Sequence, residues 1–327
     1  MSQPYGDIYR NRRVLVTGHT GFKGSWLALW LQELGANVYG YSLAPPTEPS
    51  HWNALGLELR SEIGDIRDAG HLQRFVAEAR PEIVFHLAAQ PLVRRSYEQP
   101  LETYTTNVIG SLNVYEACRA VGEVRAIVAI TTDKVYENRE WVWGYRESDS
   151  LGGHDPYSAS KAAADLLATS YGRSFWPHDG YGTRHETLLA IARAGNVVGG
   201  GDWAADRLVP DLVRGTAAGE EVLVRSPNAT RPWEHVLEPL SGYLLLGQRL
   251  WEGRSDLGRS WNFGPATDGV LTVGEVVAEL SRCWPSIRHR VAPSAEAPHE
   301  AGVLKLDCSL ARTTLQWRPV WDGLPSL

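Results

Sequence analysis

The chain has 327 residues, of which 43% are hydrophobic and 21% charged, and its formal net charge is −6. A chain of this length suits one large domain or two closely joined ones, and it can bury a large core without disulfides or metal ions. Asp and Glu outnumber Lys and Arg by 38 to 32. This balance argues against nucleic acid and anionic membranes as partners, because both select basic surfaces.

The cysteines and the N-terminus predict a cytoplasmic protein. Cys118, Cys283 and Cys308 are far apart and lack the spacing of a disulfide framework or a zinc site, so no metal site is predicted. Residues 1–13 are polar and lack the apolar core of a secretory signal. No run in the sequence approaches the roughly 18 apolar residues that a membrane span needs.

Strand and helix patterns alternate along the first 195 residues. Strands are predicted at 13–17, 37–43, 59–63, 82–86, 125–131 and 188–193, and helices at 22–34, 71–79, 112–121 and 156–171. Six strands with helices between them are typical of an α/β fold with a Rossmann-type, doubly wound parallel sheet.

The pattern breaks after Gly195, where only a helix at 272–283 and a strand at 288–291 are predicted. We therefore expect residues 1–195 to form a dinucleotide-binding domain, to which residues 236–264 return. Residues 196–235 and 265–327 are expected to form a smaller substrate lobe over the carboxyl ends of the strands, where ligands of open α/β sheets bind.

Three glycines, Gly18, Gly21 and Gly24, lie between the first strand and the first helix. Glycine allows a tight turn and close approach of the backbone to a pyrophosphate, which the helix N-terminus then binds. The small residues after the strand at 82–86 leave room for the cofactor. The predicted contacts in these two segments are Gly18, Thr20, Gly21, Phe22, Lys23, Gly24, Leu87, Ala88, Ala89 and Gln90.

The second strand lacks the acidic residue that commonly binds the ribose hydroxyls of NAD at its end. Ser42 can make one such contact, and Asp65 is expected to face the adenine side. Lys23 in the turn is compatible with a 2′-phosphate, so these residues leave the choice between NAD and NADP open. Ser42, Asp65, Ile66 and Asn107 complete the predicted cofactor contacts.

Tyr157 and Lys161 are four residues apart near the start of a predicted helix, which puts both side chains on one face. A phenol ionises near pH 10, and a neighbouring ammonium together with a nicotinamide cation favours the phenolate. We therefore predict that Tyr157 is the acid/base for a substrate hydroxyl, with Lys161 lowering its pKa. Thr132, at the end of the fifth strand, is expected to bind the same oxygen.

Together, the glycine spacing, Thr132 and the run Pro-Tyr157-Ser-Ala-Ser-Lys161 resemble the extended short-chain dehydrogenases/reductases that act on nucleotide sugars. Four further runs resemble the 4,6-dehydratases of that family: 133–147, 193–203, 231–239 and 304–307. The resemblance implies that NAD is the cofactor and CDP-glucose the substrate. It also implies a homodimer or homotetramer formed through the helices at 101–121 and 156–171.

Asp133 and Lys134 directly follow Thr132 and suit the chemistry that the resemblance implies. Oxidation of a hexose at C4 acidifies the C5 proton, water is lost across C5–C6, and the hydride returns to C6. Asp133 can protonate the departing C6 oxygen, and Lys134 can either remove the C5 proton or hold the enolate. In the related dTDP-glucose enzymes a Glu follows the Asp, so Lys134 implies a different division of roles.

The resemblance and the phosphate-binding chemistry of arginine also suggest substrate contacts. These are Gln90, Asn196, Trp203, Arg207, Arg231 and His235. At least four tryptophans, Trp141, Trp143, Trp203 and Trp233, are expected to line or cover the sugar-nucleotide site. Relatives usually continue into a further helix beyond the point where this chain ends, which leaves truncation open.

Two alternatives remain at this stage. A nucleotide-sugar 4-epimerase would share Tyr157, Lys161 and the cofactor, but it would leave Asp133 and Lys134 without a task. A non-catalytic, dinucleotide-sensing regulator would share the fold, but such proteins lose the Tyr/Lys pair that is intact here.

Overall fold

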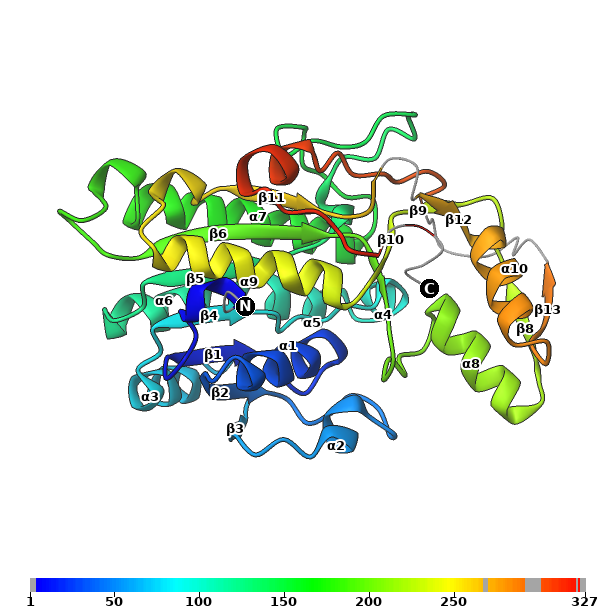
Figure 1. Ribbon diagram of the computed structural model, residues 1–327, viewed down its shortest axis with the longest axis horizontal. Helices are drawn as coiled ribbons and strands as arrows, with labels where there is room; N and C mark the ends of the chain where they lie inside the picture. The colour runs from blue at the N-terminus through cyan, green and yellow to red at the C-terminus, as the bar shows by residue number, and fades with distance from the viewer. Residues whose placement is uncertain (1–3, 267–269, 292–300, 322, 324–327) are drawn as a thin grey trace.

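The computed structural model describes residues 4–266, 270–291, 301–321 and 323. Within this part of the chain, seven parallel strands form a central sheet in the order β11-β6-β5-β4-β1-β2-β3 (Figure 1). The strands are β1 (Arg13–Thr17), β2 (Asn37–Ser42), β3 (Arg60–Ile63), β4 (Ile83–His86), β5 (Ala126–Ile130), β6 (Leu188–Ala194) and β11 (Ser260–Phe263). The predicted Rossmann-type, doubly wound α/β fold is confirmed.

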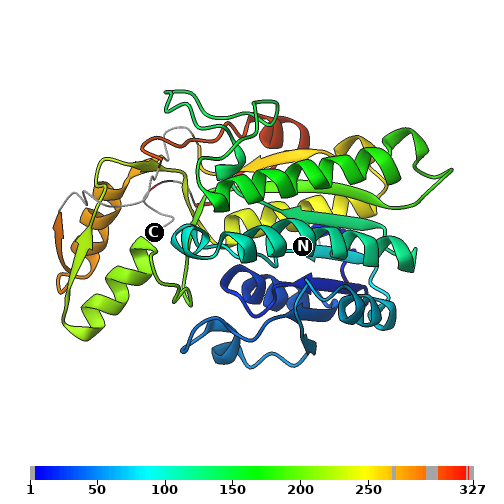
Figure 2. The same cartoon turned by 180° about the vertical axis from the view of Figure 1, so that it is seen from behind.

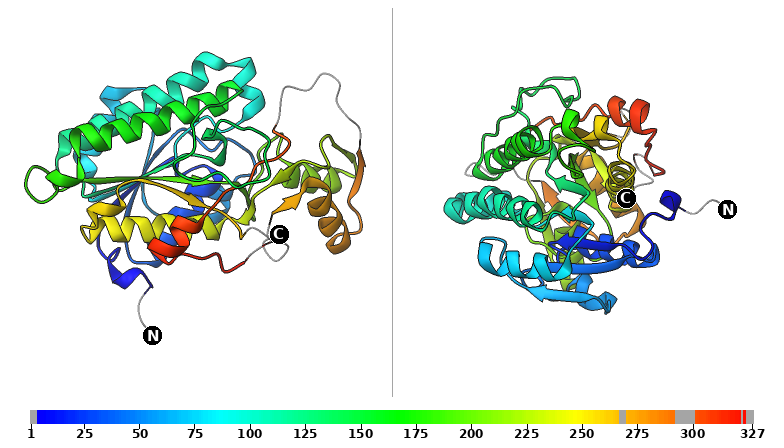
Figure 3. Two further views of the ribbon diagram at one scale, coloured as in Figure 1. Left: turned by 90° about the horizontal axis from the view of Figure 1, so that it is seen from above. Right: turned by 90° about the vertical axis from the view of Figure 1, so that its left-hand side faces the viewer.

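Helices cover both faces of the sheet, as the view from above shows (Figure 3). One face is covered by α1 (Phe22–Glu33) and α9 (Leu237–Trp251). On the other face lie α3 (Ala69–Ala79), α6 (Ser111–Val121) and α7 (Pro156–Phe175), seen from that side in Figure 2. Because the central strands are buried from both sides, they are continuous apolar runs rather than alternating ones.

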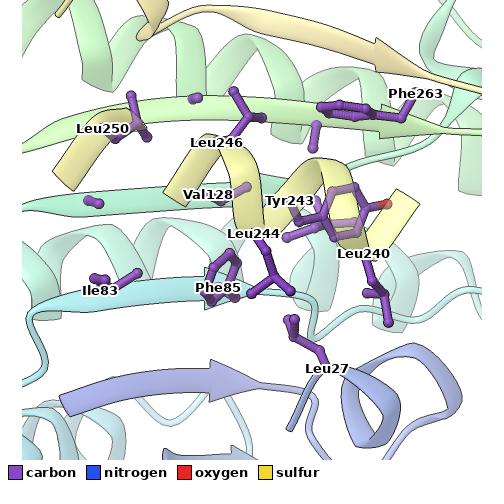
Figure 4. Packing of buried hydrophobic residues seen from close by; sticks show 14 of the residues in the cluster. Leu27, Ile83, Phe85, Val128, Leu240, Tyr243, Leu244, Leu246, Leu250 and Phe263 are labelled. Carbon is purple, nitrogen blue, oxygen red and sulfur yellow. The ribbon is translucent and has the colours of Figure 1, made fainter. Parts of the chain in front are cut away.

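The larger core lies between α9 and the middle of the sheet (Figure 4). Leu244 of α9 packs toward Phe85 of β4, with Leu27 of α1 below them, and all three side chains are fully buried. Burying one such side chain contributes roughly 1.5–3 kcal/mol. This packing holds the carboxyl ends of β1, β4, β5 and β6 in fixed positions relative to one another.

The sequence pattern missed α9 and β11 as elements, so the sheet has one more strand than the six predicted. It also missed two short helices, α2 (His51–Leu55) and α4 (Val93–Glu98), and one longer helix, α8 (Leu208–Ala218). The helical stretch 101–121 that the family resemblance implied comprises most of α5 (Pro100–Tyr104), η2 (Thr105–Gly110) and α6.

A second group of elements lies beyond the carboxyl ends of the strands, toward which the strand arrows point in Figure 1. In it, β13 (Arg288–Val291) pairs with β8 (Glu221–Val224) beside α8 and α10 (Val273–Cys283). Three short strands, β7 (Asn196–Val198), β9 (Thr230–Arg231) and β10 (Trp233–His235), lie nearer the sheet, and β12 (Leu271–Thr272) pairs with β9.

The segment after residue 301 differs from the expectation that residues 265–327 belong to the lobe. Leu315 and Trp317 are buried in the core beneath α9, where the Trp317 ring lies edge-on to Phe263 at 5.0 Å. This part of the chain therefore packs on the sheet.

Candidate active site

The glycine turn lies where β1 meets α1 and is too crowded for other residues. Gly18 has a φ of +78°, and a Cβ on it would lie 2.8 Å from the backbone nitrogen of Ala88. A Cβ on Gly24 would collide with the carbonyl of Gly18. No side chain caps α1 at Gly21, so its first turn presents backbone N–H groups to the space above the turn. This cradle suits a pyrophosphate.

A pair of hydroxyls occupies the position at the end of β2 where an acidic residue is usual. Thr20 donates to the carbonyl of Leu43 at 2.8 Å, and its oxygen lies 2.9 Å from the hydroxyl of Ser42. After β3, the carboxylate of Asp65 is held by Arg67 at 2.9 Å, which lowers the pKa of Asp65. Ile66, next to it, is buried. The hydroxyl pair can bind ribose hydroxyls without a carboxylate.

Two predicted cofactor contacts hold the chain in place after β4. The Asn107 side chain accepts from the backbone N–H of Gln90 at 2.8 Å and donates to Ser160 at 2.9 Å. The amide of Gln90 donates to Thr103 at 2.9 Å. The side chains of Asn107 and Gln90 therefore bind the protein itself, and it is the backbone from Leu87 to Ala89 that borders the cofactor cradle.

Tyr157 and Lys161 lie on the first turns of α7, near the carboxyl end of β5, and both are buried. Lys161, however, donates to the carbonyl of Ile130 at 2.9 Å and does not contact the phenol. Burial raises the pKa of Tyr157 to about 12 and lowers that of Lys161 to about 8. In the protein without cofactor, burial has the largest effect on the pKa of Tyr157; the expectation that Lys161 and a nicotinamide cation together favour the phenolate concerns the cofactor-bound protein and stays a prediction. The phenolate needs the positive charge of a bound cofactor.

Thr132, Asp133 and Lys134 form a compact polar cluster beside Tyr157. The hydroxyl of Thr132 donates to Oδ1 of Asp133 at 2.8 Å, and Thr132 also lowers the pKa of Tyr157, against the larger effect of burial. Lys134 Nζ is 3.5 Å from the same Oδ1. Asp133 is fully buried, and its Oδ2 has no hydrogen-bond partner among the described residues.

Lys23 faces this cluster and not the ribose position near Ser42. Its Nζ lies 3.5 Å from the Tyr243 hydroxyl, and burial lowers its pKa to about 8, opposed by the negative charge of Glu234. The position of Lys23 therefore does not support a contact with a 2′-phosphate. Glu234 on β10 is buried, and within the described part of the chain neither carboxylate oxygen accepts a hydrogen bond. Sequence reasoning missed Glu234.

The predicted substrate residues lie on the lobe side of the cluster. Asn196 begins β7 and is paired with Trp233, which is buried in the lobe core. Arg207 forms an ion pair with Asp202 at 2.8 Å, and its charge lowers the pKa of Tyr157, so it lies near the catalytic cluster. Arg231 is buried and donates to the carbonyl of Thr230 at 2.9 Å.

His235 and Trp203 are half-buried, also on this side. The His235 ring lies edge-on to Trp321 at 4.8 Å. The carbonyl of Trp203 accepts from Arg214. Their side chains therefore belong to the segments that connect the sheet to the lobe.

Two of the four tryptophans expected at the cleft lie together on the loop after β5. Trp141 stacks on Tyr145 at 5.3 Å and lies edge-on to Trp143, which is exposed. They border a separate surface pocket of about 380 Å³ that includes Asp307. The loop packs against residues 303–307, where Trp141 joins a small buried cluster that includes Val135 and Leu306.

A buried ion pair supports the catalytic strand, and the sequence analysis did not assign it. Arg193 on β6 donates to Asp165 of α7 at 2.7 and 2.8 Å, and Asp165 also accepts from Thr131 at 3.0 Å. The same guanidinium donates to the hydroxyl of Tyr136 at 2.8 Å. An arginine within an otherwise apolar strand was the available signal, because a buried charge requires a partner.

A doubly wound sheet with this glycine cradle and a Thr/Tyr/Lys cluster at the strand ends defines a dinucleotide-dependent enzyme of the short-chain dehydrogenase/reductase type. The sequence model of the NAD dependent epimerase/dehydratase family matches residues 14–264. The chain belongs to this family, and the predicted cofactor, NAD, is confirmed.

Individual relatives agree with this assignment. A CDP-glucose 4,6-dehydratase from Salmonella typhimurium is 50% identical over 96% of this chain and 88% of its own length. Among solved structures, the epimerase Mth375 from Methanothermobacter thermautotrophicus has a TM-score of 0.84 at 25% identity and covers 100% of this chain and 94% of that one. MoeE5 in complex with UDP-glucuronic acid and NAD has a TM-score of 0.78 at 26% identity, covering 96% and 95%.

None of the helices in the described residues is both long and apolar enough to cross a membrane.

Proposed function

We propose that the protein is a 4,6-dehydratase that converts CDP-glucose into CDP-4-keto-6-deoxyglucose. The observation that carries this proposal is the buried Asp133, placed one residue after Thr132 and beside Lys134. An epimerase needs acid/base chemistry only at C4, whereas an elimination also needs an acid at C6 and a base at C5. Choice of the cytidine nucleotide rests on the 50% identical relative.

In this proposal, bound NAD accepts a hydride from C4 and returns it to C6. Tyr157 removes the proton of the C4 hydroxyl, and Thr132 holds that oxygen. Asp133, as the neutral acid, protonates the departing C6 oxygen. Lys134 removes the C5 proton, or holds the enolate as a cation, and a proton later returns to C5.

The remaining site residues are proposed to bind and to position. The turn from Gly18 to Gly24 binds the cofactor pyrophosphate, and Thr20 and Ser42 bind the adenosine ribose. Arg207 and Arg231 neutralise the substrate diphosphate, with Asn196, Trp203 and His235 along the same side. Supporting this, these residues belong to the segments between sheet and lobe, which fits the proposed division of the chain into a dinucleotide-binding domain and a substrate lobe.

We further propose a cytoplasmic homodimer or homotetramer. Leu101, Ile109 and Leu166 are exposed on neighbouring helices of one face, at 77%, 48% and 57%. Exposed apolar side chains gathered on adjacent helices are typical of a protein interface.

The test is incubation of the purified protein with CDP-, dTDP- or UDP-glucose in D₂O, without added NAD. We expect a keto product from CDP-glucose that carries one solvent deuterium at C5. Lys134→Met should lower the rate by about 10²–10⁴-fold, the usual contribution of an acid/base group. Lys134→Arg is the matched control, because arginine keeps the positive charge but cannot act as a base. If this variant stays active, the role of Lys134 is to stabilise the enolate and not to remove the C5 proton.

A product without a keto group, epimerised at C4, would replace this proposal with the epimerase. Activity with another nucleotide sugar and none with CDP-glucose would keep the reaction and correct the substrate.

A further inference from the structure

The catalytic groups of the proposed dehydration lie on two separate elements. Tyr157, which acts at C4, is on the first turn of α7, whereas Asp133 and Lys134, which act at C6 and C5, follow the end of β5. A sugar that is held at C4 meets the groups for C5 and C6 only if the two elements keep a fixed position relative to each other. This requirement rests on the proposed function.

Two side chains on one face of α7 bind consecutive residues at the end of β5. Lys161 donates to the carbonyl of Ile130 at 2.9 Å. One turn further along the helix, the carboxylate of Asp165 accepts from the hydroxyl of Thr131 at 3.0 Å. Because they are four residues apart, Lys161 and Asp165 share the helix face that also carries Tyr157. The second contact therefore fixes the chain directly before the segment that carries the acid and the base of the elimination.

The Asp165 carboxylate is itself held in one orientation. Arg193 donates to its two oxygens at 2.7 and 2.8 Å, and both charged side chains are buried. The remaining N–H groups of the guanidinium donate to the Tyr136 hydroxyl at 2.8 Å, the Glu147 carbonyl at 3.2 Å and the Ser260 hydroxyl at 3.0 Å. Every donor of this planar group is thus used, so neither partner of the ion pair is free to turn.

A contribution to stability alone does not account for this arrangement. The cost of removing two charges from water offsets most of their attraction, and apolar residues of similar volume often stabilise a core equally well. An apolar residue in place of Asp165 could not bind the hydroxyl of Thr131, however. What the charged pair adds is a directed contact between α7 and the end of β5.

We propose that Asp165 is a positioning residue for the elimination step. Held by Arg193, it binds Thr131 and thereby fixes the segment that follows β5. The acid and the base of the elimination are then in place at C6 and C5 while the C4 oxygen lies at the phenol of Tyr157. Without this contact, the elimination slows more than the C4 oxidation, because the phenol and the cofactor site lie on other elements.

The test compares Thr131→Val, which keeps the shape and removes the hydroxyl, with Thr131→Ser, which keeps the hydroxyl. For Thr131→Val acting on CDP-glucose, we expect kcat to fall by about 10- to 10²-fold with little change in KM, because reacting groups are misplaced. Reduced cofactor should accumulate during turnover, since a hydride taken from C4 waits for the elimination; its absorbance measures this. Thr131→Ser should match the wild type in both readouts.

Thr187→Val is the matched control. Thr187 is similarly buried, and its hydroxyl donates to the carbonyl of Val124 at 2.6 Å, directly before the amino end of β6 and away from the catalytic groups. Loss of this hydroxyl should lower the melting temperature. It should change neither kcat per folded molecule nor the amount of reduced cofactor.

A second variant removes the contact by another route and serves also if Thr131→Val does not fold. Asp165→Leu combined with Arg193→Met replaces both charges with apolar side chains, so the protein should remain folded. Because Thr131 then lacks its acceptor, we expect the same slow elimination and the same accumulation of reduced cofactor.

Wild-type kcat per folded molecule in these variants would overturn the positioning role and leave the proposed function intact. A lowered kcat without accumulation of reduced cofactor would overturn it as well, because the slowed step would then not be the elimination. A wild-type protein that makes no keto product from CDP-glucose would overturn the proposed function, and the positioning role with it.

Discussion

Lys161 is held in the catalytic cluster at the expense of stability. Its ammonium is buried and has one hydrogen bond, to the carbonyl of Ile130 at 2.9 Å. Desolvation lowers its pKa from 10.5 to about 8. Below pH 8 the folded protein therefore buries a charge that the unfolded chain exposes to water. Between pH 8 and 10.5 the unfolded chain binds more protons, so the stability of the fold rises with pH.

Replacing this lysine should stabilise the protein while removing its activity. With NAD removed, we expect Lys161→Met to raise the free energy of unfolding below pH 8 by up to about 3 kcal/mol, the equivalent of the lowered pKa. The gain should shrink as the pH approaches 10.5. Thermal unfolding at pH 7 and pH 10 measures both effects.

Lys134→Met is the matched control in the same cluster. The side chain of Lys134 is partly exposed, so its ammonium does not have the desolvation cost of the buried Lys161, and its loss should not raise the melting temperature. A Lys161→Met variant less stable than wild type, with a gap that does not change with pH, would contradict this account of Lys161.

At the residue scale, the sequence predicted the site where local spacing decides it. The glycine turn and the Tyr157/Lys161 pair each lie on one short segment. Residues of one short segment are close in space regardless of how the rest of the chain folds. The protein contacts of Asn107 were not predicted, and Glu234 was missed, because distant segments decide the surroundings of both residues. Asn107 meets Ser160, and Glu234 meets the charge of Lys23, and no local pattern records either contact.

At the scale of elements, the start of α7 positions Tyr157. The side chain of Asp155 caps the helix, accepting from the backbone N–H of Ser158 at 2.9 Å and from its hydroxyl at 2.6 Å. Pro156 follows at the first helical position, where a missing N–H is harmless. The buried N-cap residue Asp155 therefore fixes the first turn of α7, which carries Tyr157.

Removing the cap should disturb catalysis more than folding. Asp155→Ala should lower the free energy of unfolding by about 1 kcal/mol, the usual contribution of such a cap. Because the first turn carries Tyr157, we expect kcat to fall at least about tenfold with little change in KM, as misplacement of a reacting group reduces the rate. Thermal unfolding and steady-state kinetics provide the two readouts.

Asp155→Asn distinguishes the effect of the capping hydrogen bond from that of the negative charge, since the amide oxygen still accepts a hydrogen bond. We expect it to retain most of the activity and stability of the wild type. If Asp155→Ala matched the wild type in kcat, the start of α7 would not depend on this cap.

Helix α9 shows why whole elements escaped the sequence pattern. Ten of its fifteen residues are buried, so it lacks the alternation of a half-exposed helix. It also contains Gly242 and Gly247, which resemble turn signals. The structure explains both: a Cβ on Gly242 would meet the ring of Phe263, and one on Gly247 would meet Phe85 at 2.8 Å. Close packing on the sheet requires glycine there, and only the tertiary fold reveals it.

At the scale of the whole molecule, the helices on one face of the sheet carry exposed apolar side chains on their outer side. Helices α5, η2 and α6 run beside α7 on this face (Figure 2). Leu101 and Leu166 point away from the core there and are more than half exposed. Isolated exposed leucines are ordinary, but several on adjacent helices indicate a partner surface. A second copy of the chain, related by a two-fold axis, would present the same helices. Leu101 and Leu166 of each copy would then be buried in the interface.

Leu166→Glu should therefore separate the assembly. Each copy of the substitution removes the burial of one leucine, roughly 1.5–3 kcal/mol, and a two-fold interface contains two copies. The dissociation constant should then rise by about 10²–10⁴-fold. Light scattering after size-exclusion chromatography over a range of concentrations measures this shift.

Val142→Glu, a charge placed on the exposed loop after β5, is the control and should leave the dimer intact. Identical masses for Leu166→Glu and wild type at every concentration would mean that α7 is not part of the interface.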